Sequence, residues 1–298
     1  MTPRRAILLT GVNGQVGWEL HRSLSALGNV VGLTSRDLDL ADVDAIRAKV
    51  AEIRPALIVN PAAYTAVDKA ESEPEKARAV NATAPGVFAE AAKACGAVLV
   101  HYSTDYVFDG GKDGPYLEDD PTAPQNIYGA TKLEGEEAIR ASGARHLIFR
   151  TSWVYGRRGA NFLLTMQRLM RGDENKRPEL KIVADQHGAP TWSRSIADAT
   201  AQALAQCLSP ARGADRPEPW GTYHMTNGGE TTWHGFAQAI AELTPLEKRP
   251  ALTPIPTSAY PTPARRPANS RLDNGKLMRN FALRLPDWRQ ALEMCLAH

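Results

Sequence analysis

Cysteine is scarce in this sequence, and so is any excess of charge. The 298 residues contain three cysteines, Cys95, Cys207 and Cys295, and carry a formal net charge of +2. The cysteines are odd in number and far apart, so they form neither a disulfide framework nor the paired spacing of a zinc site. A nearly neutral chain also lacks the basic footprint that binding to nucleic acid requires.

Long apolar runs are absent as well. No stretch approaches the length of a membrane-spanning helix, and the apolar run at residues 6–9 is too short for a secretion signal. We therefore expect a cytoplasmic protein that uses neither a membrane nor nucleic acid as a partner. The length suffices for one large domain or two modest ones.

What the sequence does contain is a glycine-rich loop after its first apolar run. Residues 6–10 are typical of a buried parallel strand, and an amphipathic helix follows at residues 18–27. Between them, Gly11 permits a tight turn, Gly14 lets the backbone approach a pyrophosphate, and Gly17 allows close packing of helix on sheet. This context predicts a dinucleotide site, with a glycine-rich turn that binds nothing as the alternative.

The residues after the second strand indicate which dinucleotide binds. Ser35 and Arg36 follow the strand at residues 29–33, where an acidic residue would instead take a ribose 2′-hydroxyl. A hydroxyl and a guanidinium suit a 2′-phosphate, so we expect NADP(H), with NADH as the alternative cofactor. Asp39 and Leu40 follow at a distance that suits the adenine. A solvated surface charge is the other interpretation of Arg36.

Strand and helix patterns alternate four times in the first half, with further strands at residues 57–60 and 97–102. Such alternation predicts a doubly wound parallel sheet that binds its ligands at the carboxyl ends of the strands. Small residues just after the third strand, Ala62 and Ala63, would allow a cofactor to come close. They are equally common in ordinary loops.

Tyr128 and Lys132 are four residues apart in a predicted helix, which places both side chains on one face. A phenol has an unperturbed pKa of about 10, and a nearby ammonium would lower the pKa of Tyr128 toward a value useful for proton transfer. Thr104 ends the fourth strand, where its hydroxyl can donate to a substrate carbonyl while Tyr128 donates a proton. Taken singly, each of these residues is also an ordinary helix or strand residue.

The second half predicts a smaller, discontinuous domain. Its proline-rich run at residues 245–267 is typical of an ordered wrap without regular structure, and residues 172–179 and 209–219 are typical of polar loops. Arg266 in the wrap is a candidate for binding a diphosphate. The expected division has residues 1–155 with 190–226 as the cofactor domain, and residues 156–189 with 227–298 as the substrate domain.

Several longer segments resemble one family of enzymes. They are residues 14–20, 64–71, 103–110, 150–155, 185–191 and 266–272. Together with the glycine loop and the Tyr-x-x-x-Lys pair, they are similar to extended short-chain dehydrogenases/reductases, and among these to the dTDP-4-dehydrorhamnose reductase family. The resemblance covers nearly the whole chain. It implies a Rossmann-like doubly wound parallel sheet with a smaller α+β domain, and NADPH-dependent reduction of the 4-keto group of dTDP-4-dehydro-L-rhamnose in dTDP-rhamnose biosynthesis.

The resemblance also implies roles for individual residues. Tyr128 would be the proton donor, Lys132 its pKa partner and ribose anchor, and Thr104 the hydroxyl that tunes the carbonyl. The implied cofactor contacts, besides Tyr128 and Lys132, are Gly11, Asn13, Gly14, Gln15, Val16, Ser35, Arg36, Asp39, Leu40, Ala62, Ala63, Tyr64 and Thr65. The implied contacts with the sugar nucleotide are Val67, Thr104, Asp105, Tyr106, Trp153 and Arg266.

One departure from the family concerns a metal ion. Some members bridge subunits through magnesium held by carboxylates, and Glu19 and Glu293 match or lie near two of those positions. Arg194 stands where a further acid is expected. Because a cation there would repel Mg²⁺, we expect no metal site, and a monomer or weak homodimer.

Three other functions stay open. A sugar-nucleotide 4,6-dehydratase carries Asp-Glu after its threonine, whereas Tyr106 follows Asp105 here, which favours a simple reductase. A 4-epimerase is not excluded by the residues. The cofactor-binding regulatory subunit of methionine adenosyltransferase resembles the same branch without being a catalyst, and the presence of Thr104, Tyr128 and Lys132 favours an enzyme over that role.

Overall fold

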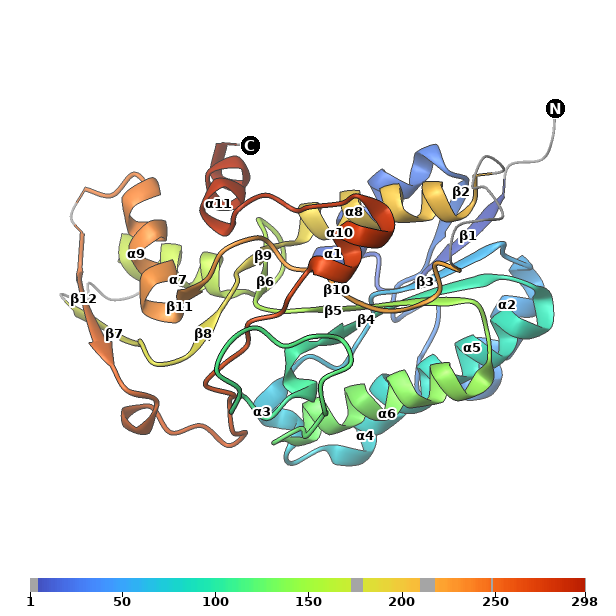
Figure 1. Ribbon diagram of the computed structural model, residues 1–298, viewed down its shortest axis with the longest axis horizontal. Helices are drawn as coiled ribbons and strands as arrows, with labels where there is room; N and C mark the ends of the chain where they lie inside the picture. Colours follow the sequence, from blue (N-terminus) through green and yellow to red (C-terminus); the bar gives the residue numbers. More distant parts are fainter. Residues whose placement is uncertain (1–4, 173–178, 210–217, 248, 298) are drawn as a thin grey trace.

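A six-stranded parallel sheet forms the centre of the protein (Figure 1). The computed structural model describes residues 5–172, 179–209, 218–247 and 249–297, so most of the two expected polar loops at residues 172–179 and 209–219 lies outside the described residues. The strand order is β2-β1-β3-β4-β5-β10. Their bounds are β1 (Ala6–Leu9), β2 (Asn29–Gly32), β3 (Leu57–Asn60), β4 (Val98–Thr104), β5 (His146–Thr151) and β10 (Gly221–His224). The predicted doubly wound parallel sheet is confirmed.

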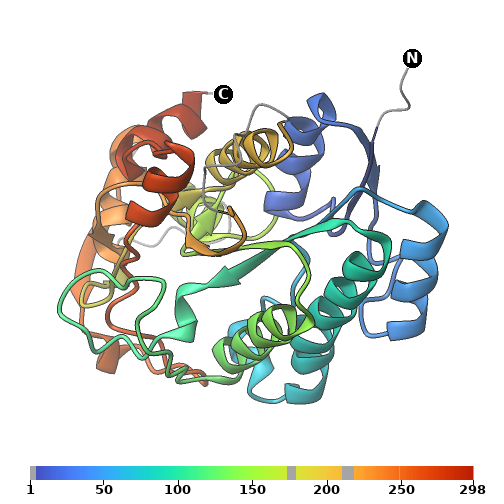
Figure 2. The same cartoon turned by 45° about the vertical axis from the view of Figure 1, so that its right-hand side comes forward.

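Helices cover both faces of this sheet (Figure 2). One face carries α1 (Gln15–Ser23), α8 (Ser193–Cys207) and α10 (Gly275–Phe281), and the other carries α2 (Val43–Ile53), α5 (Ala84–Cys95) and α6 (Ile127–Ser142). Successive strand residues serve opposite faces: Ile7 and Leu9 pack toward α1 and α8, whereas Leu8 packs toward α2 and α5. Because both faces are buried, the strands appear in the sequence as continuous apolar runs.

The strand order reverses beside β1, and this fixes where ligands can bind. β1 has β2 on one side and β3 on the other. After β1 the chain therefore continues toward one edge of the sheet, and after β3 it continues toward the other edge. Open α/β sheets bind ligands at such a switch point. The glycine loop and the small residues after β3 both lie there.

The start of α6 is set by Asn126. Its Oδ1 accepts a hydrogen bond from the backbone N–H of Gly129 (2.8 Å), and its Nδ2 donates to the carbonyl of Arg265 (2.8 Å). Such a cap satisfies a helix N–H that has no partner within the helix. The same side chain therefore begins the helix that carries Tyr128 and ties it to the distant C-terminal wrap.

The helix that contains Pro85 is continuous. It continues from α4 (Pro74–Arg78) through a π-helical turn at Ala79–Thr83 into α5. Pro85 lies in the first turn of α5, a position that tolerates a residue without N–H. The π-helical turn places Asn81 against the loop after β3, where its side chain bonds the backbone N–H (2.8 Å) and carbonyl (3.1 Å) of Tyr64.

A second apolar cluster forms the smaller domain. It joins α7 (Phe162–Arg171), α9 (Trp233–Leu243) and α11 (Trp288–Ala297) to a parallel pair of strands, β7 (Glu179–Val183) and β12 (Ala251–Ile255). The expectation that residues 245–267 carry no regular structure is therefore wrong for β12. Among the described residues β12 pairs on one side only, and an edge strand tolerates a proline such as Pro254.

Short elements complete the boundary between the two clusters. β6 (Val154–Tyr155) pairs with β9 (Thr191–Trp192), β8 (His187–Gly188) pairs with β11 (Thr231–Thr232), and α3 (Val67–Ala70) follows the loop after β3. Leu277 and Phe281 of α10 pack in the same core as Ile196 of α8. We propose the domain division expected from the sequence with one change, that residues 275–285 join the cofactor domain. Within the described residues, no helix has the length and apolarity to cross a membrane.

The contact between α6 and the π-helical turn gives a test of this packing. A Cβ at Gly135 would overlap the carbonyl oxygen of Asn81. We expect Gly135→Ala to lower the free energy of unfolding by about 1–3 kcal/mol, whereas an alanine on an open helix would raise it by about 1 kcal/mol. Urea unfolding measures the change. Glu137 is exposed on the same helix, so Glu137→Ala is the control and should change the free energy of unfolding by no more than about 0.5 kcal/mol. A higher free energy of unfolding in Gly135→Ala would contradict the packing.

Candidate active site

The glycine loop and the loop after β3 approach each other closely. Gly11 has a φ of +56°, and a Cβ there would lie 3.0 Å from the Cβ of Ala62. A Cβ at Gly17 would overlap the carbonyl oxygen of Gly11. Gly14 precedes α1 without a side-chain cap, so the first N–H groups of that helix remain available to an anion. The cradle is therefore shaped for backbone contact with a phosphate.

A pocket of about 190 Å³ opens at this switch point. Its walls come from the ends of β1, β2 and β3, and they bring together six of the expected cofactor residues. These are Gly11, Ser35, Asp39, Leu40, Ala62 and Ala63. Arg36 is exposed on the same turn. Asp37 holds the backbone of this turn, because its carboxylate accepts from the N–H and the hydroxyl of Thr34 at 2.8 and 2.7 Å.

The other expected cofactor residues differ in how they are placed. Gln15 Oε1 accepts from Asn161 Nδ2 (2.9 Å), which links the glycine loop to the start of α7. The Tyr64 hydroxyl donates to Glu73 (2.8 Å), so its phenol is engaged away from the pocket. Asn13 and Thr65 are exposed, and Val16 is half-buried. No spacing in the sequence signals Asn81, which holds the Tyr64 backbone.

Tyr128 and Thr104 converge at the carboxyl end of β4. The Thr104 side chain lies close enough to the Tyr128 phenol to affect its pKa, and the Tyr128 ring meets Tyr106 edge to face with centroids 5.8 Å apart. Burial and the nearby Asp105 carboxylate raise the pKa of Tyr128 to about 12, against the opposing effect of the Thr104 side chain. The phenol therefore keeps its proton at neutral pH, as a proton donor must.

The Lys132 side chain is held by groups other than Tyr128. Its Nζ donates to the carbonyl of Tyr102 (2.6 Å) and lies 3.0 Å from His101 Nε2. Burial lowers the pKa of Lys132 to about 7, although the Glu136 carboxylate acts in the opposite direction. Burial is the largest effect on the pKa of both groups. That Lys132 lowers the pKa of Tyr128 stays a prediction.

Asp105 offers an unused acceptor beside Thr104. Its side chain is 3% exposed, and its Oδ2 has no hydrogen-bond partner among the described residues. Burial raises the pKa of Asp105 to about 7, against hydrogen bonds with Ser270 and Thr104. An unpaired buried oxygen at this place suits a hydroxyl of a bound ligand.

Trp153 lies in a strained backbone conformation, with a φ of +49°. Its indole stacks on Trp233 with centroids 3.7 Å apart, and a Cβ at Gly188 would lie 2.7 Å from it. Trp233 Nε1 donates to Gln186 (3.1 Å). No pattern in the sequence indicates Trp233 or Gln186, because both are far from Trp153 along the chain.

A cavity of about 750 Å³ lies in the smaller domain and is walled partly by Trp233, Gln186 and Arg266. Arg266 forms a two-pronged ion pair with Asp68, at 2.7 and 2.8 Å. Asp68 is on α3, directly after Val67, so this pair joins the cofactor domain to the C-terminal wrap. Arg271, which follows the wrap, pairs with Glu230 (3.0 Å).

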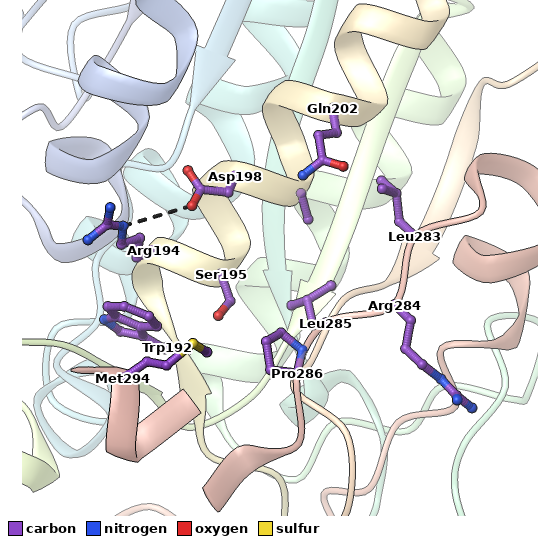
Figure 3. A pocket seen from close by; sticks show the side chains of 11 residues that line it. Trp192, Arg194, Ser195, Asp198, Gln202, Leu283, Arg284, Leu285, Pro286 and Met294 are labelled. Atoms are coloured by element: carbon purple, nitrogen blue, oxygen red, sulfur yellow. Dashed lines mark ion pairs between the residues drawn. The ribbon is translucent and has the colours of Figure 1, made fainter. Parts of the chain in front are cut away.

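Another pocket, of about 350 Å³, lies between α8 and residues 283–286 (Figure 3). Arg194 lines it and pairs with Asp198 (3.9 Å). None of the expected catalytic residues lines this pocket. In the parts of the chain that the structure describes, no group of three or more His, Cys, Asp or Glu side chains is arranged to hold a metal ion. The absence of a magnesium site stays a prediction.

Comparison with known proteins agrees with this geometry. The family model described as the RmlD substrate binding domain matches residues 5–298. The dTDP-4-dehydrorhamnose reductase of Burkholderia thailandensis is 53% identical over 298 residues, which cover 97% of each chain. The chain belongs to the dTDP-4-dehydrorhamnose reductase family. The reductase of the same name from Escherichia coli K12 is 48% identical over 97% of this chain and 96% of its own.

Solved structures give the same result for the fold of this family member. The crystal structure of dTDP-4-dehydrorhamnose reductase from Bacillus anthracis in complex with NADP superposes with a TM-score of 0.89, at 34% identity over 99% of each chain. The UDP-glucose 4-epimerase of Thermus thermophilus has a TM-score of 0.80 at 21% identity, and it shares the fold alone. The resemblance, the fold class and the class of enzyme that we predicted, an NAD(P)H-dependent reductase, are confirmed.

The exposed guanidinium on the β2 turn gives a test of cofactor choice. If Arg36 binds the 2′-phosphate, Arg36→Ala should weaken NADPH binding by roughly 10–100-fold, the loss expected for one charge-assisted hydrogen bond. NADH lacks that phosphate, so its affinity in the same variant serves as the control and should barely change. Fluorescence titration measures both constants, and equal losses would show that Arg36 does not recognise the phosphate.

Proposed function

We propose that this protein reduces the 4-keto group of dTDP-4-dehydro-L-rhamnose with NADPH and forms dTDP-L-rhamnose. The observation that carries the proposal is the meeting of Thr104 and Tyr128 at the end of β4, beside the switch-point loops. The names of its relatives at 53% and 48% identity support this sugar and this reaction.

The cradle at the switch point fits a dinucleotide. Gly11 and Gly17 leave space that a Cβ would fill, and the start of α1 would hold the pyrophosphate together with Gly14, Gln15 and Val16. Further contacts would come from Ser35 and Arg36 to the 2′-phosphate, Asp39 and Leu40 to the adenine, Lys132 to the ribose, and Ala62, Ala63 and Thr65 on the nicotinamide side. When bound, NADPH supplies the hydride.

The side chains at the end of β4 supply the proton and hold the sugar. Tyr128 is protonated at neutral pH and donates to the developing alkoxide, while the Thr104 hydroxyl polarises the carbonyl. The unpaired oxygen of Asp105 accepts from a sugar hydroxyl. Trp153, Val67 and Tyr106 form the walls of the sugar subsite.

The cavity of about 750 Å³ would take the nucleotide end of the substrate. Its volume lies in the usual range for a small-molecule site. Arg266 has five N–H donors, and its contacts with Asp68 and the Ala264 carbonyl use the Nη1 donors and one Nη2 donor. The remaining N–H groups suit a diphosphate oxygen. The cytoplasmic location and the monomer or weak homodimer remain predictions.

The decisive assay mixes purified protein, NADPH and dTDP-4-dehydro-L-rhamnose, and follows both NADPH absorbance and the sugar product. Loss of absorbance with formation of dTDP-L-rhamnose is the expected result. A cofactor-binding subunit without activity would bind NADPH and oxidise none of it. A 4-epimerase would interconvert two sugar nucleotides without net consumption of NADPH.

Tyr128→Phe tests the proton donor. The substitution keeps the ring and removes the proton, so we expect kcat to fall by roughly 10²-fold or more, as for loss of a general acid. The circular dichroism spectrum and the melting temperature should stay close to those of the unsubstituted protein and serve as the control. Near-normal turnover would exclude Tyr128 as the donor.

A further inference from the structure

Four buried polar side chains form a row from the glycine loop to Lys132. Thr10 follows β1, Asn60 ends β3 and His101 lies beside Asn60 on β4. Each of the four is at most 2% exposed. Thr10 Oγ1 donates to Asn60 Oδ1 (2.6 Å), Asn60 Nδ2 lies 3.3 Å from His101 Nδ1, and His101 Nε2 lies 3.0 Å from Lys132 Nζ.

The row also touches both loops that form the cofactor cradle. Thr10 directly precedes Gly11, and its hydroxyl oxygen accepts from the N–H of Ala62 (3.4 Å). Asn60 directly precedes the loop at residues 61–65. The position of His101 is therefore set from the same two loops that would hold the dinucleotide.

The hydrogen-bonding groups define where the protons lie. An amide nitrogen only donates, so His101 Nδ1 accepts from Asn60, and a neutral imidazole then carries its proton on Nε2. Burial, with the neighbouring charge of Lys132, holds the pKa of His101 well below its ordinary value, which keeps the ring neutral. In this arrangement the His101 N–H meets Lys132 as a free amine, which also donates to the Tyr102 carbonyl.

A charged Lys132 requires the reverse pattern. An ammonium only donates, so His101 Nε2 must accept and Nδ1 must carry the proton. Asn60 then has to turn its amide, so that its oxygen faces His101 and its nitrogen faces the Thr10 oxygen. Both patterns pair every amide and imidazole atom of the row. The row therefore has two arrangements that differ by one proton on Lys132, and in the second the Thr10 hydroxyl no longer donates to Asn60 Oδ1.

We propose that His101 is a positioning residue for the reaction, which, backed by Asn60 and Thr10, holds the Lys132 side chain and lets it gain or lose a proton while both imidazole nitrogens and the Asn60 amide keep a partner. This inference rests on the proposed function for its catalytic consequence. After Tyr128 has donated its proton, an ammonium at Lys132 stabilises the phenolate. The alkaline limb of the pH profile then marks the loss of the Lys132 proton.

Other titratable and charged groups lie on the elements around Lys132. They are Tyr128 and Glu136 on its own helix, Asp105 after β4, and Arg150 on β5. Of these, Glu136 acts directly on the Lys132 equilibrium. Glu136 favours the ammonium, but it is paired with Arg150 (2.7 Å) and Arg140 (3.0 Å), which reduces its effect. None of these groups changes in the variants that test His101.

The test uses two substitutions that act in opposite directions. Asn60→Asp places a carboxylate that accepts a hydrogen bond from His101 Nδ1. His101 Nε2 then accepts from the Lys132 ammonium. We therefore expect the alkaline limb of kcat/KM to move up by about one pH unit. His101→Leu removes the acceptor, so the limb should move down and turnover at neutral pH should fall about tenfold. His101→Gln retains an acceptor and should restore most of the turnover.

Two measurements keep the outcome decisive. The pH dependence of NADPH binding, followed by fluorescence, reports on Lys132 without the sugar, so it separates failure of this inference from failure of the proposed function. Tyr102→Phe, on the same strand, removes a hydroxyl that bonds Thr200 (2.9 Å) and should leave both profiles unchanged. The proposal is overturned if Asn60→Asp and His101→Leu both fold and their alkaline limbs stay in place or move in the same direction. If His101→Leu does not fold, the comparison of Asn60→Asp with His101→Gln decides the question.

Discussion

Thr10, Asn60 and His101 are buried near the carboxyl edge of the sheet and pair with one another, and the site depends on this pairing. An unpaired buried polar group costs about as much as a lost hydrogen bond, roughly 1–3 kcal/mol. β1, β3 and β4 are neighbours in one parallel sheet, so the side chains at their ends meet in register. Thr10, Asn60 and His101 satisfy each other there, and the last of them reaches the catalytic helix through Lys132. One network thus positions both the cofactor loops and the lysine.

The sequence predicted those parts of the fold that depend on neighbouring residues. The glycine loop requires glycine at positions 11 and 17, because a Cβ at either position would contact Ala62 or backbone atoms too closely. Both positions lie within one short segment of the sequence. The buried strands follow from continuous apolar runs, because helices cover both faces of the sheet. What the sequence could not give were pairings across long separations: β12 with β7, Trp153 with Trp233, and Asn81 with the Tyr64 backbone.

The relation between Tyr128 and Lys132 shows why residue spacing does not fix the chemistry of a site. Four residues on a helix place both groups on one face, which is correct. Whether the ammonium lowers the pKa of the phenol depends on how deeply each group is buried and on which other groups they contact. Here Lys132 is 1% exposed and bonds a carbonyl and an imidazole, while Tyr128 has Asp105 beside it. Burial raises the pKa of Tyr128, together with the like-signed Asp105, and burial lowers the pKa of Lys132.

The same reasoning explains why the C-terminal wrap belongs to the site, although it is more than a hundred residues from Tyr128 in the chain. Asn126 caps the helix of Tyr128 and bonds the carbonyl of Arg265, and Arg266 pairs with Asp68 beside the cofactor loop. Ser270 bonds Asp105, the acceptor next to Thr104. A substrate bound between the domains therefore meets one connected surface, in which the wrap helps to set the start of the catalytic helix, the placement of Asp105 and the remaining donors of Arg266. Displacement of the wrap would alter all three together.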